Sequence, residues 1–267
     1  MNSQPTSDLP RITPEMPMVD AQCEKHGAYR AKQIPSFMGH PPITMACPTC
    51  SAEKRAAAEH ERIEAEARAR ANRVQMLFNR AGIPMRFAGR TLGNYQAETA
   101  PQKRALKIAQ RFVESFDEGS VAGASLVLAG KPGTGKTHIA CGIGRALMEE
   151  TRSVLFMTVL QALRHIKDTY RRDSEKSESD AIKDMLRPDL LILDEIGAQL
   201  GSEHEKMLMF EIINERYQQC RSTILISNLT GEELTAFLGD RVMDRFRESG
   251  ALVAFDWSSY RGKRLDA

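Results

Sequence analysis

Apolar residues follow two spacings along the chain, and each spacing predicts a different kind of element. Ala105, Ile108, Phe112 and Phe116 recur at helical spacing, which predicts an amphipathic helix over residues 101–116. Further helices are predicted at 136–150, 160–170 and 205–219, and short unbroken apolar runs predict buried strands at 125–129, 154–158, 190–193, 223–227 and 251–255. Residues 171–180, charged and serine-rich, are expected to form a mobile loop. Apolar strands that alternate with helices favour a parallel sheet covered on both faces, so we predict an α/β domain.

The amino-terminal part of the chain lacks this alternation and is predicted to contain three smaller segments. Residues 1–22 are proline-rich and poor in large apolar groups, which indicates a flexible tail. Residues 23–50 are rich in Pro, Gly, His and Cys and form a compact module. Residues 51–89 contain a charged helical arm dominated by Ala, Glu and Arg, followed by a linker that starts at Gly82 and Pro84. The remaining residues, 90–267, form the main domain.

Composition restricts the class of protein. The chain has 267 residues, a formal charge of +2 and 42% apolar residues, enough for a buried core. None of its apolar runs approaches the roughly 20 residues of a membrane span, and residues 1–19 lack the apolar core of a signal peptide. Five cysteines without such a leader indicate a reducing compartment, so we expect a cytoplasmic protein. The near-neutral charge leaves only local basic patches for contact with nucleic acid.

A phosphate-binding loop follows the first predicted strand of the main domain. Its residues fit G-x-x-x-x-G-K-[ST] at every fixed position: Gly130, Lys131, Pro132, Gly133, Thr134, Gly135, Lys136 and Thr137. The glycines bring backbone N–H groups close to phosphate oxygens, and the start of the next helix, which includes His138, adds its partial positive charge. Lys136 is expected to reach the β- and γ-phosphates of ATP, and the Thr137 hydroxyl to bind Mg²⁺.

Two acidic residues and one amide complete the predicted nucleotide site. Asp194 and Glu195 end the strand at 190–193, where Asp194 can hold Mg²⁺ and Glu195 can act as general base toward an attacking water. Asn228 follows the strand at 223–227 and can orient that water or sense the γ-phosphate. A second interpretation of Asn228 is that it only opens the turn that follows.

A separate set of metal ligands lies in the amino-terminal module. Cys23 and His26 form one pair and Cys47 and Cys50 another, twenty residues apart, which is the spacing of a structural zinc site. His40 is a spare ligand in this interpretation. Scattered free thiols are the alternative, and Cys141 and Cys220, which lie in predicted helices, are expected to be packing residues.

Several motifs together resemble those of the DnaC helicase loaders, AAA+ relatives of the initiator DnaA with the transposition helper IstB as a cousin. They are the phosphate loop, Leu191-Ile-Leu-Asp-Glu-Ile-Gly197, Asn228, Gly239-Asp-Arg-Val-Met-Asp-Arg245 and Phe255-Asp-Trp-Ser-Ser-Tyr-Arg261, with Phe78-Asn-Arg-Ala-Gly-Ile83 and Tyr95 similar to the family's linker. The resemblance covers about residues 75–262 and implies that 90–267 is an AAA+ ATPase domain.

The resemblance also implies partners. Such a protein binds the replicative hexameric helicase through its amino-terminal part and helps to place it on single-stranded DNA, with ATP as the switch. Arg245 would be an arginine finger that contacts the ATP of the next subunit, so that the ATP site mediates self-association. The helix at 160–170 occupies the position of a DNA-contacting element. From the residues alone, the helix at 160–170 could equally be an ordinary amphipathic helix with a charged outer face. The arginines could likewise form a solvated helix face; they are Arg241, Arg245 and Arg247. The cysteine module departs from the best-known loaders.

Three other functions compete with a helicase loader. An IstB-like transposition helper would share the ATPase core but act with a transposase on duplex DNA. A metabolite kinase would need an acceptor pocket, and Glu195 beside Asp194 suits attack by water better. A zinc-dependent nucleic-acid binder with a vestigial nucleotide fold would not need the full set of Lys136, Thr137, Asp194 and Glu195. The ending at 255–261 and the segment at 78–82 favour the loader.

Overall fold

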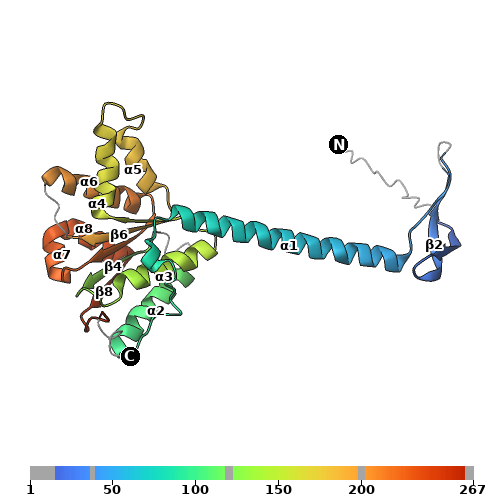
Figure 1. Cartoon of the computed structure of the whole chain (residues 1–267), viewed down its shortest axis with the longest axis horizontal. Helices are drawn as coiled ribbons and strands as arrows, with labels where there is room; N and C mark the ends of the chain where they lie inside the picture. The colour runs from blue at the N-terminus through green and yellow to red at the C-terminus, as the bar shows by residue number, and fades with distance from the viewer. Residues whose placement is uncertain (1–15, 37–39, 118–122, 198–201, 262–267) are drawn as a thin grey trace, which may run out of the picture. The chain divides into compact units, whose positions relative to one another are not determined.

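The computed structural model describes residues 16–36, 40–117, 123–197 and 202–261 of the chain, drawn in Figure 1. These residues form two compact units, which divide between Ala69 and Arg70. Helix α1 (Pro48–Arg80) is the element that runs through this division. Most of the predicted tail, residues 1–15, lies outside the described residues.

The small unit contains an antiparallel sheet in the order β1-β2-β3, formed by β1 (Met18–Cys23), β2 (Gly27–Ile34) and β3 (Ile43–Thr44). Cys23 pairs with Gly27 across the tight β1–β2 turn. Residues 18–22, which we assigned to the tail, therefore belong to a strand. The reason is that Val19, Ala21 and Cys23 are half-buried in alternation with exposed residues, a two-residue period hidden by the prolines before it.

Helix α1 has 33 residues and none of them is buried. Its exposed middle carries charged pairs three or four residues apart, such as Arg62 with Glu59 at 2.7 Å, which support a solvated helix. Its last turns belong to the large unit. There, the guanidinium of Arg145 lies 5.1 Å from the ring centre of Phe78, and the Phe156 N–H donates to the Ala81 carbonyl at 2.7 Å. The end of α1 is thereby fixed to the edge strand of the large unit's sheet.

The large unit is built on a five-stranded parallel sheet in the order β5-β6-β7-β4-β8. Its strands are β4 (Ser125–Gly130), β5 (Val154–Thr158), β6 (Leu190–Ile196), β7 (Ser222–Ser227) and β8 (Gly250–Phe255). This arrangement confirms the predicted α/β domain. All five strands run in one direction, so the polar residues at their carboxyl ends gather at one edge of the sheet.

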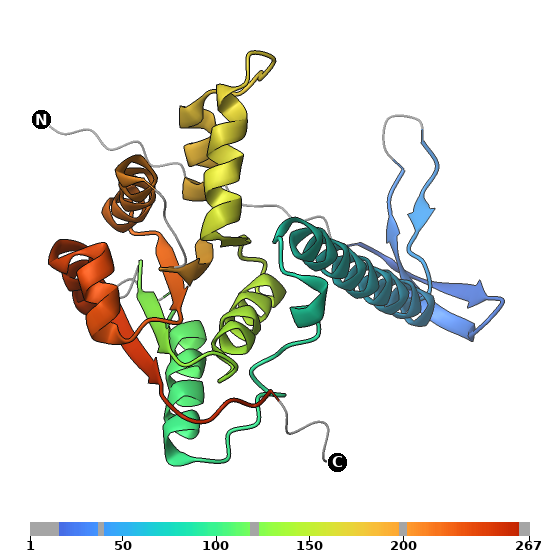
Figure 2. The ribbon, with the colours of Figure 1, turned by 60° about the vertical axis from the view of Figure 1, so that its left-hand side comes forward.

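Helices cover both faces of the sheet (Figure 2). On one face, α2 (Ala100–Glu114) and α3 (Lys136–Glu149) pack against Leu126 and Leu128 of β4. On the other face, Val127 and Ala129 pack in a cluster with α4 (Val159–Lys167), α5 (Glu178–Leu186), α6 (Glu203–Gln218), α7 (Gly231–Leu238) and α8 (Asp240–Ser249). The described part of this unit also contains two short 3₁₀ helices, Met85–Phe87 and Asp168–Tyr170.

The predicted loop at 171–180 needs a correction, because α5 begins within it at Glu178. Ser177 is the cap: its hydroxyl accepts from the Asp180 N–H, and the Asp180 carboxylate accepts from the Ser177 N–H. Such reciprocal capping starts a helix even where the local composition is serine-rich and charged. Among the described residues, the helices lack the combination of length and apolar character that crossing a bilayer requires.

Candidate nucleotide-binding site and metal centre

The phosphate loop lies at the carboxyl edge of the sheet, between the end of β4 at Gly130 and the start of α3 at Lys136. Gly130 has a φ of 127°, and a Cβ there would lie 2.4 Å from the carbonyl oxygen of Phe255 on the neighbouring strand β8. Only glycine fits that backbone against the adjacent strand. The N–H of Lys131 then donates to the same Phe255 carbonyl at 2.9 Å, which holds the start of the loop to the sheet.

Lys136 is buried, with 5% of its surface exposed. Its ammonium group donates to the carbonyl oxygens of Gly130 and Lys131, both at 2.7 Å, and to Oδ1 of Asn228 at 3.0 Å. Burial lowers the pKa of Lys136 to about 8, while the nearby Asp194 carboxylate acts in the opposite direction. The lysine predicted to bind phosphate and the amide predicted to sense it are therefore in direct contact.

Thr137 and Asp194, the predicted magnesium ligands, also meet. The Thr137 hydroxyl donates to Oδ2 of Asp194 at 3.0 Å, across the gap between α3 and the end of β6. Burial raises the pKa of Asp194, and the hydrogen bonds from Glu195 N and Thr137 act against this rise. A hydroxyl and a carboxylate at this distance form the oxygen-ligand pair that Mg²⁺ prefers beside a phosphate.

Glu195 has an exposed side chain and an uncommon backbone. Its φ is 65°, at an irregularity in the pairing of β6 with β7, and its N–H donates to Oδ1 of Asp194 at 2.7 Å. In a regular strand, successive side chains point to opposite faces of the sheet. The left-handed conformation at Glu195 interrupts this alternation. Asp194 is consequently held in the site while Glu195 is free to face solvent, where an attacking water would come from.

Aromatic residues from two distant segments contact the outside of the loop. The Thr134 carbonyl accepts from the indole Nε1 of Trp257 at 3.0 Å and from the Tyr95 hydroxyl at 3.3 Å. The Tyr260 N–H donates to the Gly133 carbonyl at 2.8 Å, and a Cβ on Gly133 would lie 2.0 Å from the Ser259 hydroxyl. These bonds use carbonyl oxygens of the loop and so leave its N–H groups to a phosphate. Sequence reasoning placed Tyr95 and Trp257 in family motifs and gave them no role.

The remaining loop residues lie at its rim. Lys131 and Pro132 are exposed, and Lys131 offers its side chain to solvent beside the loop. The His138 ring turns away from the loop toward the segment before α2, with Nε2 at 2.8 Å from Oδ1 of Asn94 and 3.0 Å from the Thr91 carbonyl. Burial lowers the pKa of His138, which favours its neutral form. His138 therefore fixes a neighbouring segment against the start of α3.

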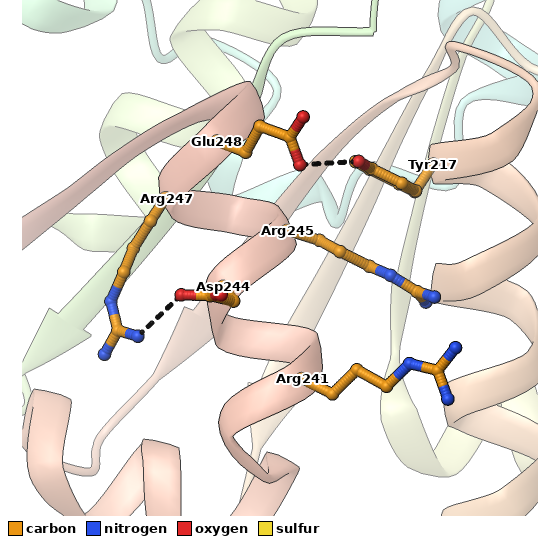
Figure 3. A pocket seen from close by; sticks show the side chains of 6 residues that line it. All are labelled: Tyr217, Arg241, Asp244, Arg245, Arg247 and Glu248. Carbon is orange, nitrogen blue, oxygen red and sulfur yellow. Dashed lines mark hydrogen bonds and ion pairs between the residues drawn. The ribbon is translucent and has the colours of Figure 1, made fainter.

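Arg245 lies on α8 in a separate, open pocket of about 660 Å³ lined by six residues (Figure 3), namely Tyr217, Arg241, Asp244, Arg245, Arg247 and Glu248. Its guanidinium donates to Oδ1 of Asn214 and lies 5.2 Å from the ring centre of Tyr217. The Tyr217 hydroxyl in turn donates to Glu248 at 2.7 Å. None of the six lining residues belongs to the phosphate loop of the same chain, so Arg245 is not part of that site within one subunit.

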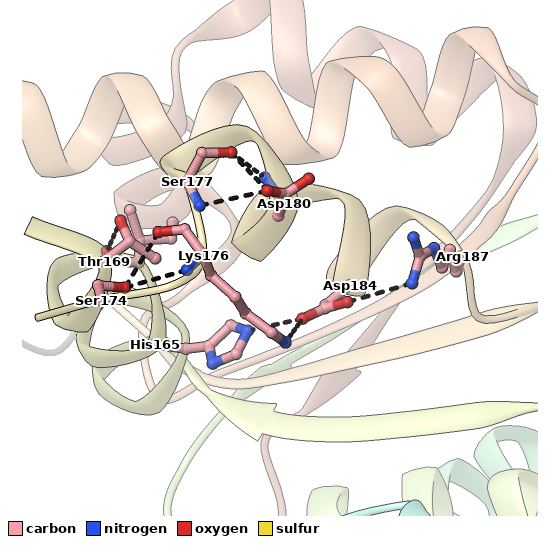
Figure 4. Close-up of polar contacts among 9 residues, drawn as sticks. His165, Thr169, Ser174, Lys176, Ser177, Asp180, Asp184 and Arg187 are labelled. Atoms are coloured by element: carbon pink, nitrogen blue, oxygen red, sulfur yellow. Dashed lines mark hydrogen bonds and ion pairs between the residues drawn. The ribbon is translucent and has the colours of Figure 1, made fainter.

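The basic residues of α4, the predicted DNA-contacting helix, are partly paired with carboxylates (Figure 4). His165 lies 3.2 Å from Oδ2 of Asp184 on α5, and Lys176 and Arg187 contact the same carboxylate at 2.9 and 3.4 Å. Lys167 pairs with Glu205 on α6. Arg164 on α4 and Arg172 in the following loop are exposed. The carboxylate of Asp184 is thus contacted by three basic side chains, while Arg164 and Arg172 are exposed to solvent.

The four predicted zinc ligands converge in the small unit. One ligand atom from each of Cys23, His26, Cys47 and Cys50 lies within 4.8 Å of all the others. The Cys23 and Cys50 sulfurs are 3.5 Å apart, and His26 Nδ1 is 3.2 Å from Cys50 and 3.7 Å from Cys47. A tetrahedral zinc site with Zn–S bonds of about 2.3 Å places its ligand atoms about 3.8 Å apart, so the cluster fits such an ion. His40 is not part of this cluster.

The pKa values of the three neighbouring thiols shift in different directions. Backbone N–H groups of His26 and Lys25 lower the pKa of Cys23, and those of Cys50 and Thr49 lower the pKa of Cys47. The pKa of Cys50 instead rises to about 11, chiefly through its hydrogen bond with Cys23. Three adjacent thiols cannot all ionise without a positive charge among them, and a bound Zn²⁺ would supply that charge.

Comparison with known proteins now identifies the family. A family model described as "IstB-like ATP binding protein" matches residues 51–266. The replicative helicase loader DnaC of Escherichia coli (strain K12) is 41% identical over 195 residues, which is 73% of this chain and 78% of DnaC. The chain belongs to the IstB-like ATP-binding family.

Solved structures agree with the fold of this IstB-like protein. A crystal structure of the DnaC helicase loader matches with a TM-score of 0.58 and 25% identity, covering 65% of this chain and all of that one. AMPPCP-bound DnaA from Aquifex aeolicus matches with a TM-score of 0.55 and 21% identity over 66% of this chain and 52% of DnaA, which shows the fold alone. The large unit is thus an AAA+ domain. The IstB-like match begins at residue 51, so Cys23, His26, Cys47 and Cys50 lie before the matched part.

Proposed function

We propose that this protein is an ATP-dependent helicase loader. It binds the replicative hexameric DNA helicase and helps to place it on single-stranded DNA, with ATP binding and hydrolysis as the switch between bound and released states. The observation that carries this proposal is the 41% identity to the E. coli helicase loader over 73% of the chain. The contacts of Lys136 with Asn228 and of Thr137 with Asp194 support an intact ATP site.

ATP would bind with its phosphates on the N–H groups of the loop, residues 133–137, at the start of α3. Lys136 would exchange the carbonyl oxygens of Gly130 and Lys131 for phosphate oxygens, a movement of one side chain. Thr137 and Asp194 would hold Mg²⁺, which neutralises charge on the phosphates when bound. Asp194 must then be ionised, and the cation nearby would oppose the rise of its pKa caused by burial.

Hydrolysis would require three further side chains. Glu195, exposed at the edge of the site, would orient and deprotonate the attacking water. Asn228, which accepts a hydrogen bond from Lys136, would move with the lysine when its ammonium group binds the γ-phosphate. Its position would therefore differ with and without ATP. Arg245 would act on the ATP of the neighbouring subunit, since the lining of its pocket includes no residue of its own phosphate loop. Self-association and hydrolysis would thus be linked.

Single-stranded DNA would contact the surface formed by α4 and the loop after it. Arg164 and Arg172 are exposed there and offer guanidinium groups to phosphates without reading bases. Asp184 holds Lys176 close to α5, which keeps the ammonium group of Lys176 near that surface. The amino-terminal module, residues 23–50, with the arm that follows it would dock on the helicase. Zinc bound by its three cysteines and one histidine would be structural, because a closed four-ligand site leaves no position for a substrate.

The test is complex formation with the helicase of the same host. The purified protein and helicase are mixed with ATP, with ADP and without nucleotide, and each mixture is passed through size-exclusion chromatography. We expect a defined co-eluting complex whose stability depends on the nucleotide. A chain starting at Arg70, the first residue of the large unit, is expected to lose the complex while it still binds ATP.

Separate elution in all three conditions would contradict the helicase-loader proposal. The next partner would then be a transposase, since the matching family model carries the IstB name. Lys136→Ala serves as a control, because loss of the ammonium group should abolish nucleotide binding and make the three elution profiles identical.

A further inference from the structure

His26 lies between the thiols of the small unit and a carboxylate on α1. Its Nδ1 faces the sulfurs, at 3.2 Å from Cys50, whereas its Nε2 lies 3.1 Å from Oε1 of Glu53. The second oxygen of Glu53 accepts from the ammonium group of Lys25, which precedes His26 in the β1–β2 turn. The His26 side chain is 22% exposed and Glu53 46%, so Glu53 forms the solvent side of the cluster.

We propose that Glu53, supported by Lys25, is a positioning residue of the metal centre. Its carboxylate accepts the Nε2–H of His26, which fixes the tautomer of the ring and presents Nδ1 to the metal. The proposal rests on the zinc site proposed above. A neutral imidazole has one protonated and one free nitrogen, so a fixed acceptor at Nε2 decides which nitrogen remains to bind a cation.

The charges around the cluster explain why Lys25 belongs to this arrangement. Three thiolates and a neutral imidazole around a divalent ion leave one net negative charge, and Glu53 adds a second beside it. The Lys25 ammonium group, bound to the same carboxylate, offsets that addition. Glu53 can thus orient His26 without a large electrostatic penalty on the thiolates.

The position of Glu53 also ties the metal to the start of α1. Cys50 lies in the first turn of this helix and Glu53 follows three residues later, on the same side. Both contact His26 of the β1–β2 turn. A bound metal would therefore fasten the turn to the first two turns of the helix through two independent contacts, one to the ion and one to the ring that binds it.

Metal affinity of the full chain tests this proposal. Co²⁺ and Zn²⁺ are titrated into the metal-free protein, with the cobalt–thiolate absorption as the signal and zinc measured by competition. Glu53→Ala should weaken Zn²⁺ binding about ten- to a hundredfold, as is usual for the acceptor of a ligand histidine. Glu53→Gln keeps an acceptor oxygen and should retain most of the affinity. Glu61→Ala removes an exposed carboxylate farther along the same helix and should have no effect.

The tautomer of His26 provides a readout that loss of structure would not imitate. In ¹⁵N-resolved spectra of the zinc-loaded chain, we expect the proton on Nε2 in the wild type and in Glu53→Gln. An Nε2-bound metal, or unchanged affinity in Glu53→Ala, would overturn the positioning role. A wild type that binds neither metal would instead refute the zinc site itself, so the two failures are distinct.

Discussion

Lys136 is a buried cation whose partners are neutral oxygens. Its ammonium group contacts two loop carbonyls and one amide, and burial brings its pKa down to about 8. A triphosphate would replace these neutral partners by anionic ones and favour the protonated lysine strongly. Because the free lysine loses its proton above about pH 8, ATP binding at higher pH must include the uptake of a proton, and this requirement makes affinity depend on pH.

ATP affinity of the wild type is therefore expected to fall as the pH rises from 7 to 9.5. Below the pKa of the free protein the lysine is already charged and the affinity is flat; above it, affinity decreases by up to about tenfold per pH unit. Titration with a fluorescent ATP analogue at several pH values measures this. Lys136→Arg is the matched variant, since guanidinium stays charged over the whole range: weaker binding without a pH slope is expected. A flat profile in the wild type would contradict the proposed role of burial.

Much of the nucleotide site could be predicted at the residue scale, because its signal is local. The phosphate loop has a fixed spacing, and Asp194, Glu195 and Asn228 follow apolar strands whose ends meet at one edge of a parallel sheet. Trp257 bonds to a residue 123 positions away in the chain, and spacing along a single sequence carries no information on such a contact. The position of Glu53 near the cysteines had only a weak signal in the sequence, namely a carboxylate one helical turn after Cys50.

Arg216 is the central connection between elements on the α6 face of the sheet. It is fully buried, and its guanidinium donates to the carbonyl oxygens of Met185, Leu186, Pro188, Asp189 and Ser222 and to the hydroxyl of Thr223. These groups lie at the end of α5, before β6 and at the start of β7. One side chain on α6 therefore satisfies the buried carbonyls of a whole junction, and β6 leads from there to Asp194.

Replacing Arg216 by Met would keep the apolar stem and leave these carbonyls without their donor. We expect a loss of about 3 kcal/mol or more in the free energy of unfolding, measured by urea denaturation. Arg221 is the matched control: it is 38% exposed and binds Asp189 at 2.8 Å, so Arg221→Ala should cost less than about 1 kcal/mol. Equal losses in the two variants would show that the buried arginine is not the connection we describe.

Elements were predictable where one physical signal dominated. The strands of the large unit were found because unbroken apolar runs are rare outside a covered sheet, and α2, α3 and α6 were found within two residues of their ends. The sequence did not reveal α5, whose start depends on a reciprocal cap between Ser177 and Asp180. It also missed β1, because proline and exposed methionines hide its alternation. The cap of α5 depends on two specific hydrogen bonds, and the alternation of β1 spans only six residues, so composition outweighed both signals.

At the scale of the whole molecule, the separate location of Arg245 is the main consequence of the fold. Its pocket on α8 is lined by no residue of the phosphate loop, and in the function we propose a site complete for hydrolysis forms only between copies of the chain. Arg245→Ala should therefore spare ATP binding while it removes DNA-stimulated hydrolysis and assembly. Glu195→Gln should bind ATP, assemble and fail to hydrolyse it.

A mixture of these two inactive variants provides the sharpest test of a finger supplied between subunits. In mixed assemblies, an Arg245→Ala subunit with intact Glu195 receives the finger of a Glu195→Gln neighbour, so hydrolysis should reappear on mixing and reach a fraction of the wild-type rate. The steady-state ATPase rate is followed as the ratio of the variants is changed. A rate that stays at the sum of the separate rates would place Arg245 outside the neighbour's site.

Trp257, which bonds to the Thr134 carbonyl on the outside of the phosphate loop, is the single tryptophan of the chain. Its indole also packs against Phe255, with ring centres 4.7 Å apart. Every photon of tryptophan emission from this protein consequently originates at the back of the ATP site. The chain carries its own optical label there, at a position where a change in the loop alters a hydrogen bond of the fluorophore itself, and no dye or added residue is required to observe it.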